Sequence, residues 1–201
     1  MSQHMWNERF SAPGFAYGDQ PQAFLRTVAS GLPCGDIVCL AEGEGRNAVF
    51  LASLGNRVTA VDWSEAGLAK IQALASIHQV QVDTVLSDIT TYDAGSAAWD
   101  GIVLVFAHLP PRQRAALHQA CVRALKPGGW LVLVAYTPRQ LAWGTGGPKD
   151  PELLMEPETI RRELRGLRME RLEEIETHLE EGAYHVGQSA LLQVLARKPE
   201  A

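Results

Sequence analysis

Two glycines and an aspartate in the first third of the chain have the types and spacing of a nucleotide-binding half-site. Gly43 and Gly45 lie in a turn after the apolar run DIVCLA, and Asp62 ends the next apolar run, RVTAVD. Glycine takes backbone angles that a side chain forbids, so this turn can pass close beneath a ligand. A helix that begins there presents unpaired N–H groups and the positive end of its dipole. A carboxylate at Asp62 can accept hydrogen bonds from ribose hydroxyls. The pattern therefore predicts a nucleotide-type cofactor, and the plainer alternative is a strand–turn–helix without a ligand.

Alternating apolar runs and helical patterns surround this turn. The strands that we predict are residues 36–41, 57–62, 81–86, 100–106 and 130–136, and the helices between them are 20–29, 46–54, 64–77 and 110–125. Such alternation is typical of a parallel sheet with helices on its faces. Ser64 has the type and place of a helix N-cap, and Pro110-Pro111 suits the first turn of a helix.

The pattern changes after Tyr136. Residues 137–157 are rich in Gly and Pro and predict a long surface loop, followed by a short helix over 158–167. Residues 168–179 and 188–197 then predict an antiparallel hairpin. The expected fold class is therefore α/β, with a single-domain, Rossmann-like, doubly wound and mostly parallel sheet of seven strands that ends in a C-terminal antiparallel hairpin.

Composition excludes several classes of function. The chain has 201 residues, 46% of them hydrophobic, and a formal net charge of −5, which argues against a nucleic-acid-binding face. No apolar run is long enough to span a bilayer, and the N-terminus lacks the pattern of a secretory signal. We therefore expect a cytoplasmic protein. We also expect a monomer or weak homodimer that acts on a small molecule. Cys39 and Cys121 are expected in the core, and Cys34 in a loop, where it is either inert or a reactive thiol.

The order of several motifs resembles the class I S-adenosylmethionine-dependent methyltransferases. These motifs are AEGEGRN, VTAVDWS, SDI, WDGIVLVFAHLP and LKPGGWLVLVAY, and they cover residues 31–136. More narrowly, WNERF, TPRQLAWGTGGP and EGAYHVG resemble the TehB-like (tellurite-resistance) branch. The resemblance implies S-adenosyl-L-methionine as the cofactor. It also implies one domain over 1–201, with a lid or helix at 1–30, the cofactor-binding core at 31–136, and an acceptor-side loop, helix and hairpin at 137–201.

Two positions depart from the broad family pattern, which places an acid and a glycine where this chain has Cys39 and Ala41. The role of the family's acid is therefore not carried over to Cys39. The resemblance implies that Glu42 supplies the charge that meets the ammonium group of the cofactor's methionine.

The resemblance implies a set of cofactor contacts. Asp88 is expected at the adenine amino group, with a loop or cap aspartate as the alternative, while Ile89 packs on the adenine ring. Trp63 covers the other face or is an ordinary core residue. Tyr17 contacts the methionine carboxylate from the lid, and the alternative is that the N-terminal segment is a frayed tail or a packing arm. The full set of expected cofactor-binding residues is Trp6, Tyr17, Ala41, Glu42, Gly43, Asn47, Asp62, Trp63, Asp88, Ile89 and Phe106.

Three residues are expected on the acceptor side. His185, in a turn between the last two strands, could take a proton from the acceptor or orient it. His108 follows the fourth strand and is either a catalytic group beside the methyl or a structural histidine. Arg139 either lines the acceptor pocket or is simply solvated. His178 could lie near His185, but a tight set of metal ligands is missing, and no metal site is predicted.

The expected function is methyl transfer from S-adenosylmethionine to a small-molecule acceptor, namely a soft nucleophile such as a thiol, selenium or tellurium species. The sequence shows no acid–base pair that would require oxygen chemistry, and it lacks the motif that marks methylation of nucleic-acid amino groups. A catalytically inactive cofactor-binding protein and a nicotinamide-dependent reductase are the alternatives.

Overall fold

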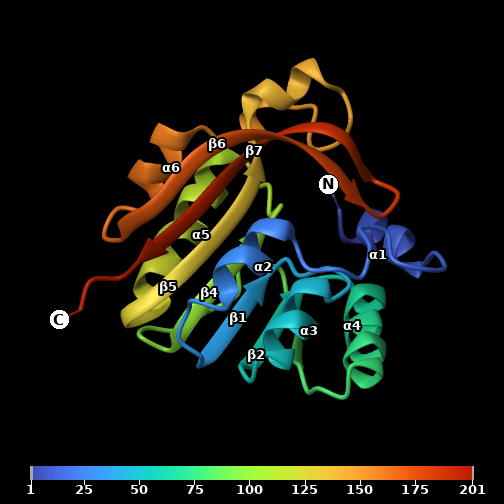
Figure 1. Ribbon diagram of the computed structural model, residues 1–201, viewed down its shortest axis with the longest axis horizontal. Coiled ribbons are helices and arrows are strands. Elements are labelled where there is room, and N and C mark those ends of the chain that lie inside the picture. The colour runs from blue at the N-terminus through green and yellow to red at the C-terminus, as the bar shows by residue number, and fades with distance from the viewer. Residues whose placement is uncertain (1, 201) are drawn as a thin grey trace.

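A computed structural model describes residues 2–200, and within this range seven strands form one mixed sheet (Figure 1). Their order across the sheet is β3-β2-β1-β4-β5-β7-β6. The parallel strands are β1 (Asp36–Leu40), β2 (Arg57–Asp62), β3 (Asp83–Leu86), β4 (Trp99–Val105) and β5 (Leu125–Tyr136). The hairpin of β6 (Arg168–Glu181) and β7 (His185–Arg197) adds to β5 in the antiparallel sense. The predicted fold class is confirmed.

Helices cover both faces of the sheet. The α-helices are α1 (Gln3–Ser11), α2 (Ala23–Ala29), α3 (Arg46–Ser53), α4 (Glu65–Ile77), α5 (Pro111–Ala124) and α6 (Pro157–Glu163). Apolar residues of α2, α3 and α4 belong to one core cluster, and those of α5 and α6 belong to the other. Two short 3₁₀-helices, η1 (Pro138–Ala142) and η2 (Pro151–Leu153), lie in the segment that was expected to be an irregular loop.

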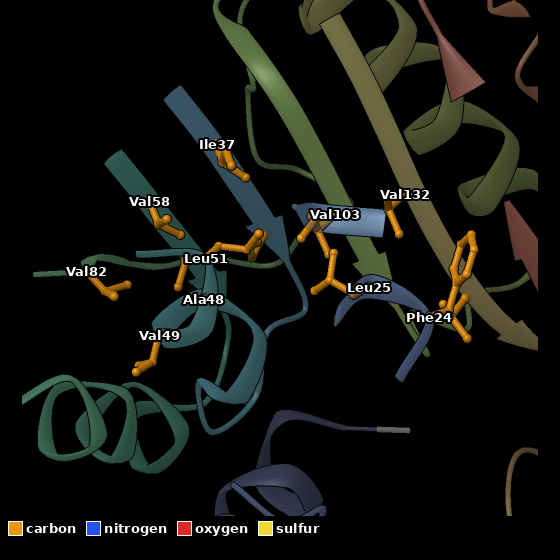
Figure 2. Packing of buried hydrophobic residues seen from close by; sticks show 14 of the residues in the cluster. Phe24, Leu25, Ile37, Ala48, Val49, Leu51, Val58, Val82, Val103 and Val132 are labelled. Carbon is orange, nitrogen blue, oxygen red and sulfur yellow. The ribbon is translucent and has the colours of Figure 1, made fainter. Parts of the chain in front are cut away.

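The alternation of side chains along each strand builds these two clusters. In β1, Ile37 and Cys39 point into the cluster beneath α2, α3 and α4, whereas Val38 and Leu40 belong to the cluster on the opposite face. All four are fully or almost fully buried, as expected for a parallel strand covered on both sides. Figure 2 shows the first cluster, where Leu25 of α2 and Leu51 of α3 lie beside Val103 and Ile37. The packed sheet is thus a rigid support for the loops at its ends.

Local sequence signals determine where two helices begin. The Ser64 hydroxyl accepts a hydrogen bond from the Gly67 N–H at 3.1 Å, which confirms the predicted N-cap of α4. Helix α5 begins at Pro111 after Pro110, where a missing N–H costs nothing.

Several boundaries differ from the predicted ones. Strand β5 begins at Leu125, five residues earlier than expected, because Leu125 pairs with Trp99 across an irregularity in the ladder. Helix α6 ends at Glu163, and β3 has only four residues. The hairpin strands are longer than expected, so the turn between them comprises only residues 182–184, and His185 is the first residue of β7 rather than a turn residue.

The N-terminal segment lies against the tip of this hairpin, although the two are at opposite ends of the chain (Figure 1). The Ala183 N–H donates to the Ala16 carbonyl at 2.9 Å. A Cβ atom at Gly182 would come within 2.4 Å of the Ala16 oxygen, so only glycine allows this close approach. The contact joins α1 and the hairpin into a roof at one end of the sheet.

Candidate active site

A cavity of about 740 Å³ lies beneath this roof, at the carboxyl ends of the parallel strands. In open α/β sheets, ligands bind at the carboxyl ends of two neighbouring strands whose connections lead to helices on opposite faces of the sheet. The cavity lies at such a point. Here these strands are β1 and β4, whose connections lead to α3 on one face and α5 on the other. The volume falls within the range of small-molecule sites. All eleven cofactor-binding residues that the sequence predicted line it: Trp6, Tyr17, Ala41, Glu42, Gly43, Asn47, Asp62, Trp63, Asp88, Ile89 and Phe106.

The backbone is strained at the two strands that border the cavity. Ala41, directly after β1, has a φ of 55°, and Phe106, directly after β4, has a φ of 56°. Non-glycine residues rarely adopt this left-handed region, and strained residues of this kind cluster at functional sites, although Gln79 and Ala97 of this chain adopt it away from the cavity. Gly43 and Gly45 follow with φ of 68° and 98°. The chain therefore turns sharply out of β1, as predicted. A Cβ atom on Gly43 would meet the Phe10 ring at 3.2 Å, so a side chain there would push against α1.

Glu42 holds the beginning of α3. Its Oε1 accepts hydrogen bonds from the N–H groups of Asn47 and Ala48 at 2.9 and 2.8 Å. These are two of the donors that a helix N-terminus leaves unpaired. Burial raises the pKa of this carboxyl to about 7, against the opposing effect of the two N–H donors. Glu42 is therefore a titratable group on the cavity wall, where a cationic ligand group would favour its ionised form.

Asp62 joins the glycine turn to the start of α4. Its Oδ2 accepts from the Gly43 N–H at 2.8 Å, and its Oδ1 accepts from the Ser64 N–H at 2.9 Å. Each oxygen keeps a second lone pair, so the carboxylate can still accept from a ligand. Burial raises the pKa of Asp62, while the backbone donors oppose this. Asp62 thus has the acceptors that ribose hydroxyls need, in a fixed orientation.

The far end of the cavity has the residues expected around an adenine ring. Asp88 follows β3, and its Oδ1 accepts a hydrogen bond from the Thr90 N–H at 2.8 Å. This oxygen therefore caps the loop, as the alternative to an adenine contact expected. Ile89 is buried, and Trp63 is half-buried on the cavity wall. An apolar slot with one carboxylate at its edge suits a flat base that carries an amino group.

Helix α1 is docked by specific contacts. The Asn7 Oδ1 accepts from the Ser64 hydroxyl at 2.7 Å, and Gln3 donates to the Trp63 carbonyl at 2.7 Å. Phe10 is buried, with its ring 5.2 Å from that of Trp6. These contacts place α1 over the glycine turn and do not fit a frayed tail, whereas a lid and a packing arm both fit them.

His185 lies in the cavity beside a carboxylate. Its Nδ1 is 3.4 Å from the Glu181 Oε2, which also accepts from the Arg46 guanidinium at 2.9 Å. The His185 ring is buried, with its centroid 4.4 Å from those of Tyr17 and Phe106. Burial lowers the pKa of His185, and Glu181 opposes this. A neutral imidazole whose Nδ1 faces a carboxylate can accept a proton at Nε2. The tautomer is inferred from this contact.

His108 has no nitrogen left for catalysis. Its Nδ1 lies 2.8 Å from the Leu153 carbonyl, to which it donates, and its Nε2 accepts from the Tyr136 N–H at 3.2 Å. Burial lowers the pKa of His108 to about 4, so the ring is neutral. Both ring nitrogens of His108 are occupied in holding the 150–155 segment to β5. His108 is therefore a structural histidine rather than the catalytic group that was expected.

Arg139 and His178 lie apart from the cavity. Arg139 pairs with Glu176, and its side chain is 60% exposed, so the expected place in the acceptor pocket is not the one observed. His178 pairs with Glu180 and is 58% exposed, whereas His185 is buried on the neighbouring strand. Arg139 is therefore a solvated surface residue, which was the alternative to a place in the acceptor pocket.

Sequence reasoning missed Glu181 and the role of Arg46. Arg46 opens α3, where a positive charge faces the positive end of the helix dipole, and this unfavourable placement is the signal that the residue has an anionic partner. The partner, Glu181, is 135 positions away, and nothing in the sequence indicates which of the many glutamates near the C-terminus it is.

None of the three cysteines is among the residues that line this cavity. Cys39 and Cys121 are buried, and Cys34 is exposed. Among residues 2–200 no group of three or more His, Cys, Asp or Glu side chains could hold a metal ion. No helix in the described part of the chain is long and apolar enough to cross a membrane.

The comparisons with known proteins agree with this geometry. Residues 37–129 match the family model described as a methyltransferase domain. The chain is 26% identical over 156 residues to a ubiquinone biosynthesis O-methyltransferase of Idiomarina loihiensis, which covers 69% of this chain. The chain spans 63% of the length of that curated relative.

Two solved structures show the same fold. One is a SAM-dependent methyltransferase from Methanosarcina mazei, with a TM-score of 0.72 and 15% identity, covering 90% of this chain and 100% of that one. The other is TehB from Haemophilus influenzae, with a TM-score of 0.69 and 19% identity, covering 87% of this chain and 61% of that one. Both structures are under 25% identical to this chain, so they show the fold alone, whereas the match of residues 37–129 indicates a methyltransferase domain, whose family implies S-adenosyl-L-methionine as the cofactor.

Proposed function

Because residues 37–129 match the methyltransferase domain, we propose that this chain transfers a methyl group from S-adenosylmethionine to a small-molecule acceptor. The observation that carries the proposal is the cavity, which brings the glycine turn, Asp62 and Asp88 together with His185. In this proposal residues 1–30 supply a lid or helix, 31–136 the cofactor-binding core, and 137–201 the acceptor-side loop, helix and hairpin. A cytoplasmic location, a monomer or weak homodimer, and an acceptor other than a nucleic acid belong to the same proposal.

The residues of the cavity fit this cofactor. Glu42 offers a carboxylate to an ammonium group, Asp62 offers acceptors to two hydroxyls, and Asp88 offers one to an exocyclic amine. When bound, S-adenosylmethionine supplies a methyl group on a positively charged sulfur, which leaves as a neutral thioether. The remaining task of the protein is to orient the acceptor, exclude water and remove a proton.

His185 is the residue proposed to remove that proton. Its Nε2 accepts the proton from the acceptor, and the resulting imidazolium is stabilised by the Glu181 carboxylate 3.4 Å from Nδ1. The aromatic rings of Tyr17, Phe106 and Tyr136 surround the imidazole and exclude water. Such a wall favours a polarisable nucleophile that sheds its hydration at low cost. A soft acceptor, namely a thiol, selenium or tellurium species, therefore remains the first candidate, and the resemblance to the TehB-like branch is part of this proposal.

A hydroxyl acceptor is the second candidate. The sequence showed no acid–base pair, but the contact between His185 and Glu181 provides one, and an imidazole held by a carboxylate can assist deprotonation of a hydroxyl group. The curated relative is named as an O-methyltransferase, which favours the same candidate.

The test is methyl transfer from labelled S-adenosylmethionine to matched acceptors, measured as formation of S-adenosylhomocysteine. The panel pairs benzenethiol with phenol and adds selenite and tellurite. We expect turnover with at least one soft acceptor, while turnover with phenol alone would select the second candidate. No turnover together with tight S-adenosylhomocysteine binding would favour the inactive binding protein. Binding of a nicotinamide cofactor instead would favour the reductase.

Substitution of His185 tests its role in the same assay. His185→Gln should lower turnover by about 10²–10⁴-fold and leave S-adenosylhomocysteine affinity nearly unchanged. The matched control is His178→Gln, an exposed histidine on the same hairpin. Because burial lowers the pKa of His185 from its usual value, wild-type turnover at saturating cofactor should fall on acidification, as the ring becomes protonated. Equal turnover of His185→Gln and wild type would remove His185 from the mechanism.

A further inference from the structure

The fold gathers aromatic side chains in the cavity. Of the 14 Phe, Tyr and Trp residues in the chain, seven line it, although such residues make up only 7% of the sequence. Three of them belong to α1 or directly follow β2, namely Trp6, Phe10 and Trp63. The other four come from four different segments, and we call them the aromatic wall: Tyr17, Phe106, Tyr136 and Tyr184. The aromatic wall therefore forms only where the fold brings the N-terminal segment, the ends of β4 and β5, and the hairpin turn together.

The aromatic wall surrounds His185, the proposed base. The ring centroids of Tyr17 and Phe106 lie 4.4 Å from that of the imidazole, and the centroid of Tyr136 lies 5.5 Å from it. The Tyr17 ring is in turn 5.8 Å from that of Tyr184. Tyr184 is the most accessible member of the wall, at 48% exposure, whereas the other three are buried or half-buried. Tyr184 therefore has ring surface that the protein itself does not use.

The charge beside Tyr184 limits what this ring surface can bind. Aromatic rings attract either cations or other aromatic rings. The guanidinium carbon of Arg9 already lies 4.4 Å from the centroid of the Tyr184 ring and 4.9 Å from that of Trp6. A cationic acceptor would meet this positive charge and be repelled. An aromatic ring is therefore the planar group that the free part of Tyr184 suits.

We propose that the methyl acceptor is an aromatic compound, whose ring packs against Tyr184 while its thiol or hydroxyl group faces His185. The inference rests on the proposed function and deepens it by naming the class of the acceptor. Ring–ring contacts add to the free energy of apolar burial, so an aromatic acceptor binds more tightly than a saturated one of the same shape. Selenite and tellurite have no apolar surface to bury and gain nothing from the aromatic wall.

The test compares benzyl alcohol with cyclohexylmethanol, which has the same hydroxyl group on a saturated ring of similar size. Each alcohol is titrated by NMR into protein saturated with S-adenosylhomocysteine, so that the cofactor part of the cavity is filled. One aromatic contact favours an aromatic ligand by about 2–10-fold, and several act together in the aromatic wall. Wild type should therefore bind benzyl alcohol at least about tenfold more tightly than cyclohexylmethanol.

Substitutions of Tyr184 test the ring contact itself. Tyr184→Leu keeps apolar surface but removes the ring, and the preference for benzyl alcohol should fall by about 2–10-fold. Tyr184→Phe keeps the ring and should keep the preference. The matched control is Trp143→Leu, which removes an aromatic side chain that is 42% exposed and does not line the cavity. Loss of support for the roof would weaken both alcohols alike, so only the ratio of the two affinities reports on the ring.

Three results would overturn the inference. The first is a wild type that does not prefer benzyl alcohol or binds neither alcohol. The second is a preference that Tyr184→Leu retains in full. The third is turnover of selenite or tellurite without turnover of benzenethiol or phenol in the acceptor panel. A wild type that does not bind S-adenosylhomocysteine refutes the proposed function instead, and the two alcohols, titrated without nucleoside into wild type and Tyr184→Leu, then decide on the ring contact.

Discussion

Glu42 and Asp62 each hold the polypeptide and also face the cavity. The Glu42 carboxylate accepts from the first N–H groups of α3, and the Asp62 carboxylate joins the glycine turn to α4. A ligand therefore meets acceptors that the backbone has already oriented, which lowers the cost of ordering them on binding. Mutation of either residue consequently changes stability and binding together, and the two effects have to be measured separately.

For Asp62, we expect Asp62→Ala to weaken S-adenosylhomocysteine binding by about 1.5–3 kcal/mol, the range for hydrogen bonds to a charged group. The variant should also be less stable by about 1–3 kcal/mol, because the Gly43 N–H loses its acceptor in a half-buried turn. Titration calorimetry gives the first value and urea unfolding the second. Asp83→Ala, an exposed aspartate on β3, is the control. Unchanged affinity in Asp62→Ala would exclude Asp62 from the site.

For Glu42, we expect ligand binding to release a proton near neutral pH. Burial places the pKa of its carboxyl at about 7, so part of the free protein is protonated there. An ammonium group beside it favours the ionised form and lowers this pKa, so binding expels the proton. Calorimetry of S-adenosylhomocysteine at pH 7 in phosphate and in Tris detects the release as a difference in binding enthalpy. The difference should shrink at pH 9 and in Glu42→Gln. A difference of the same size in Glu42→Gln would assign the proton to another group.

At the scale of elements, the cavity depends on contacts between α1, the glycine turn and α4. A Cβ atom on Gly67, in the first turn of α4, would lie 2.6 Å from the Gly43 carbonyl oxygen and 3.1 Å from the Phe10 ring. Glycine at this helix position thus serves packing, since alanine is the better helix former. The three elements approach one another closely only because Gly67 has no side chain.

Gly67→Ala is therefore expected to destabilise the protein, in contrast to the usual gain of about 0.5–1 kcal/mol for this change in a helix. The Gly43 carbonyl must move, so S-adenosylhomocysteine affinity should also fall. Gly31→Ala is the control, because its nearest contact would be an ordinary 3.6 Å and its backbone is not left-handed. Thermal melts and calorimetry of both variants test this. A Gly67→Ala protein with higher stability and normal affinity would show that the turn is free to shift.

Sequence patterns predicted the elements better than their contacts. The buried strands β1 and β4 were found because both faces are covered, which leaves a continuous apolar run. The start of β5 was missed because Leu125 continues the helical pattern and yet pairs with Trp99. In the site, the glycine turn and Asp62 are close in sequence and were recognised together. The pairing of Arg46 with Glu181 depends on how the hairpin folds back, and no local signal contains it.

At the scale of the whole molecule, the cavity is closed by segments from both ends of the chain. The N-terminal segment contacts the hairpin tip through the hydrogen bond from Ala183 to Ala16, and Arg46 bonds to both the Tyr17 carbonyl and Glu181. The sheet beneath carries the glycine turn (Figure 1). The roof is supported mainly by these polar contacts and by aromatic contacts, whereas the sheet is supported by two large apolar clusters. The roof should therefore open locally at a lower free energy than the sheet unfolds.

Hydrogen exchange with and without S-adenosylhomocysteine tests this difference. In the free protein, amides of α1 and of the hairpin tip at 181–186 should exchange much faster than those of β1 and β4. Ligand binding should slow exchange in both roof segments together, because a ligand that contacts only the closed form stabilises it by mass action. The amides of β4 should slow as well, because their exchange requires global unfolding and the ligand raises the free energy of that unfolding by the same mass action, but they should remain the slowest. Disruption of the Arg46–Glu181 pair by Glu181→Gln should separate the two roof segments, so that the ligand protects α1 but protects the hairpin tip less. Protection that stays equal in both segments of this variant would mean that the Ala183–Ala16 hydrogen bond and the aromatic contacts, not the ion pair, join the two segments.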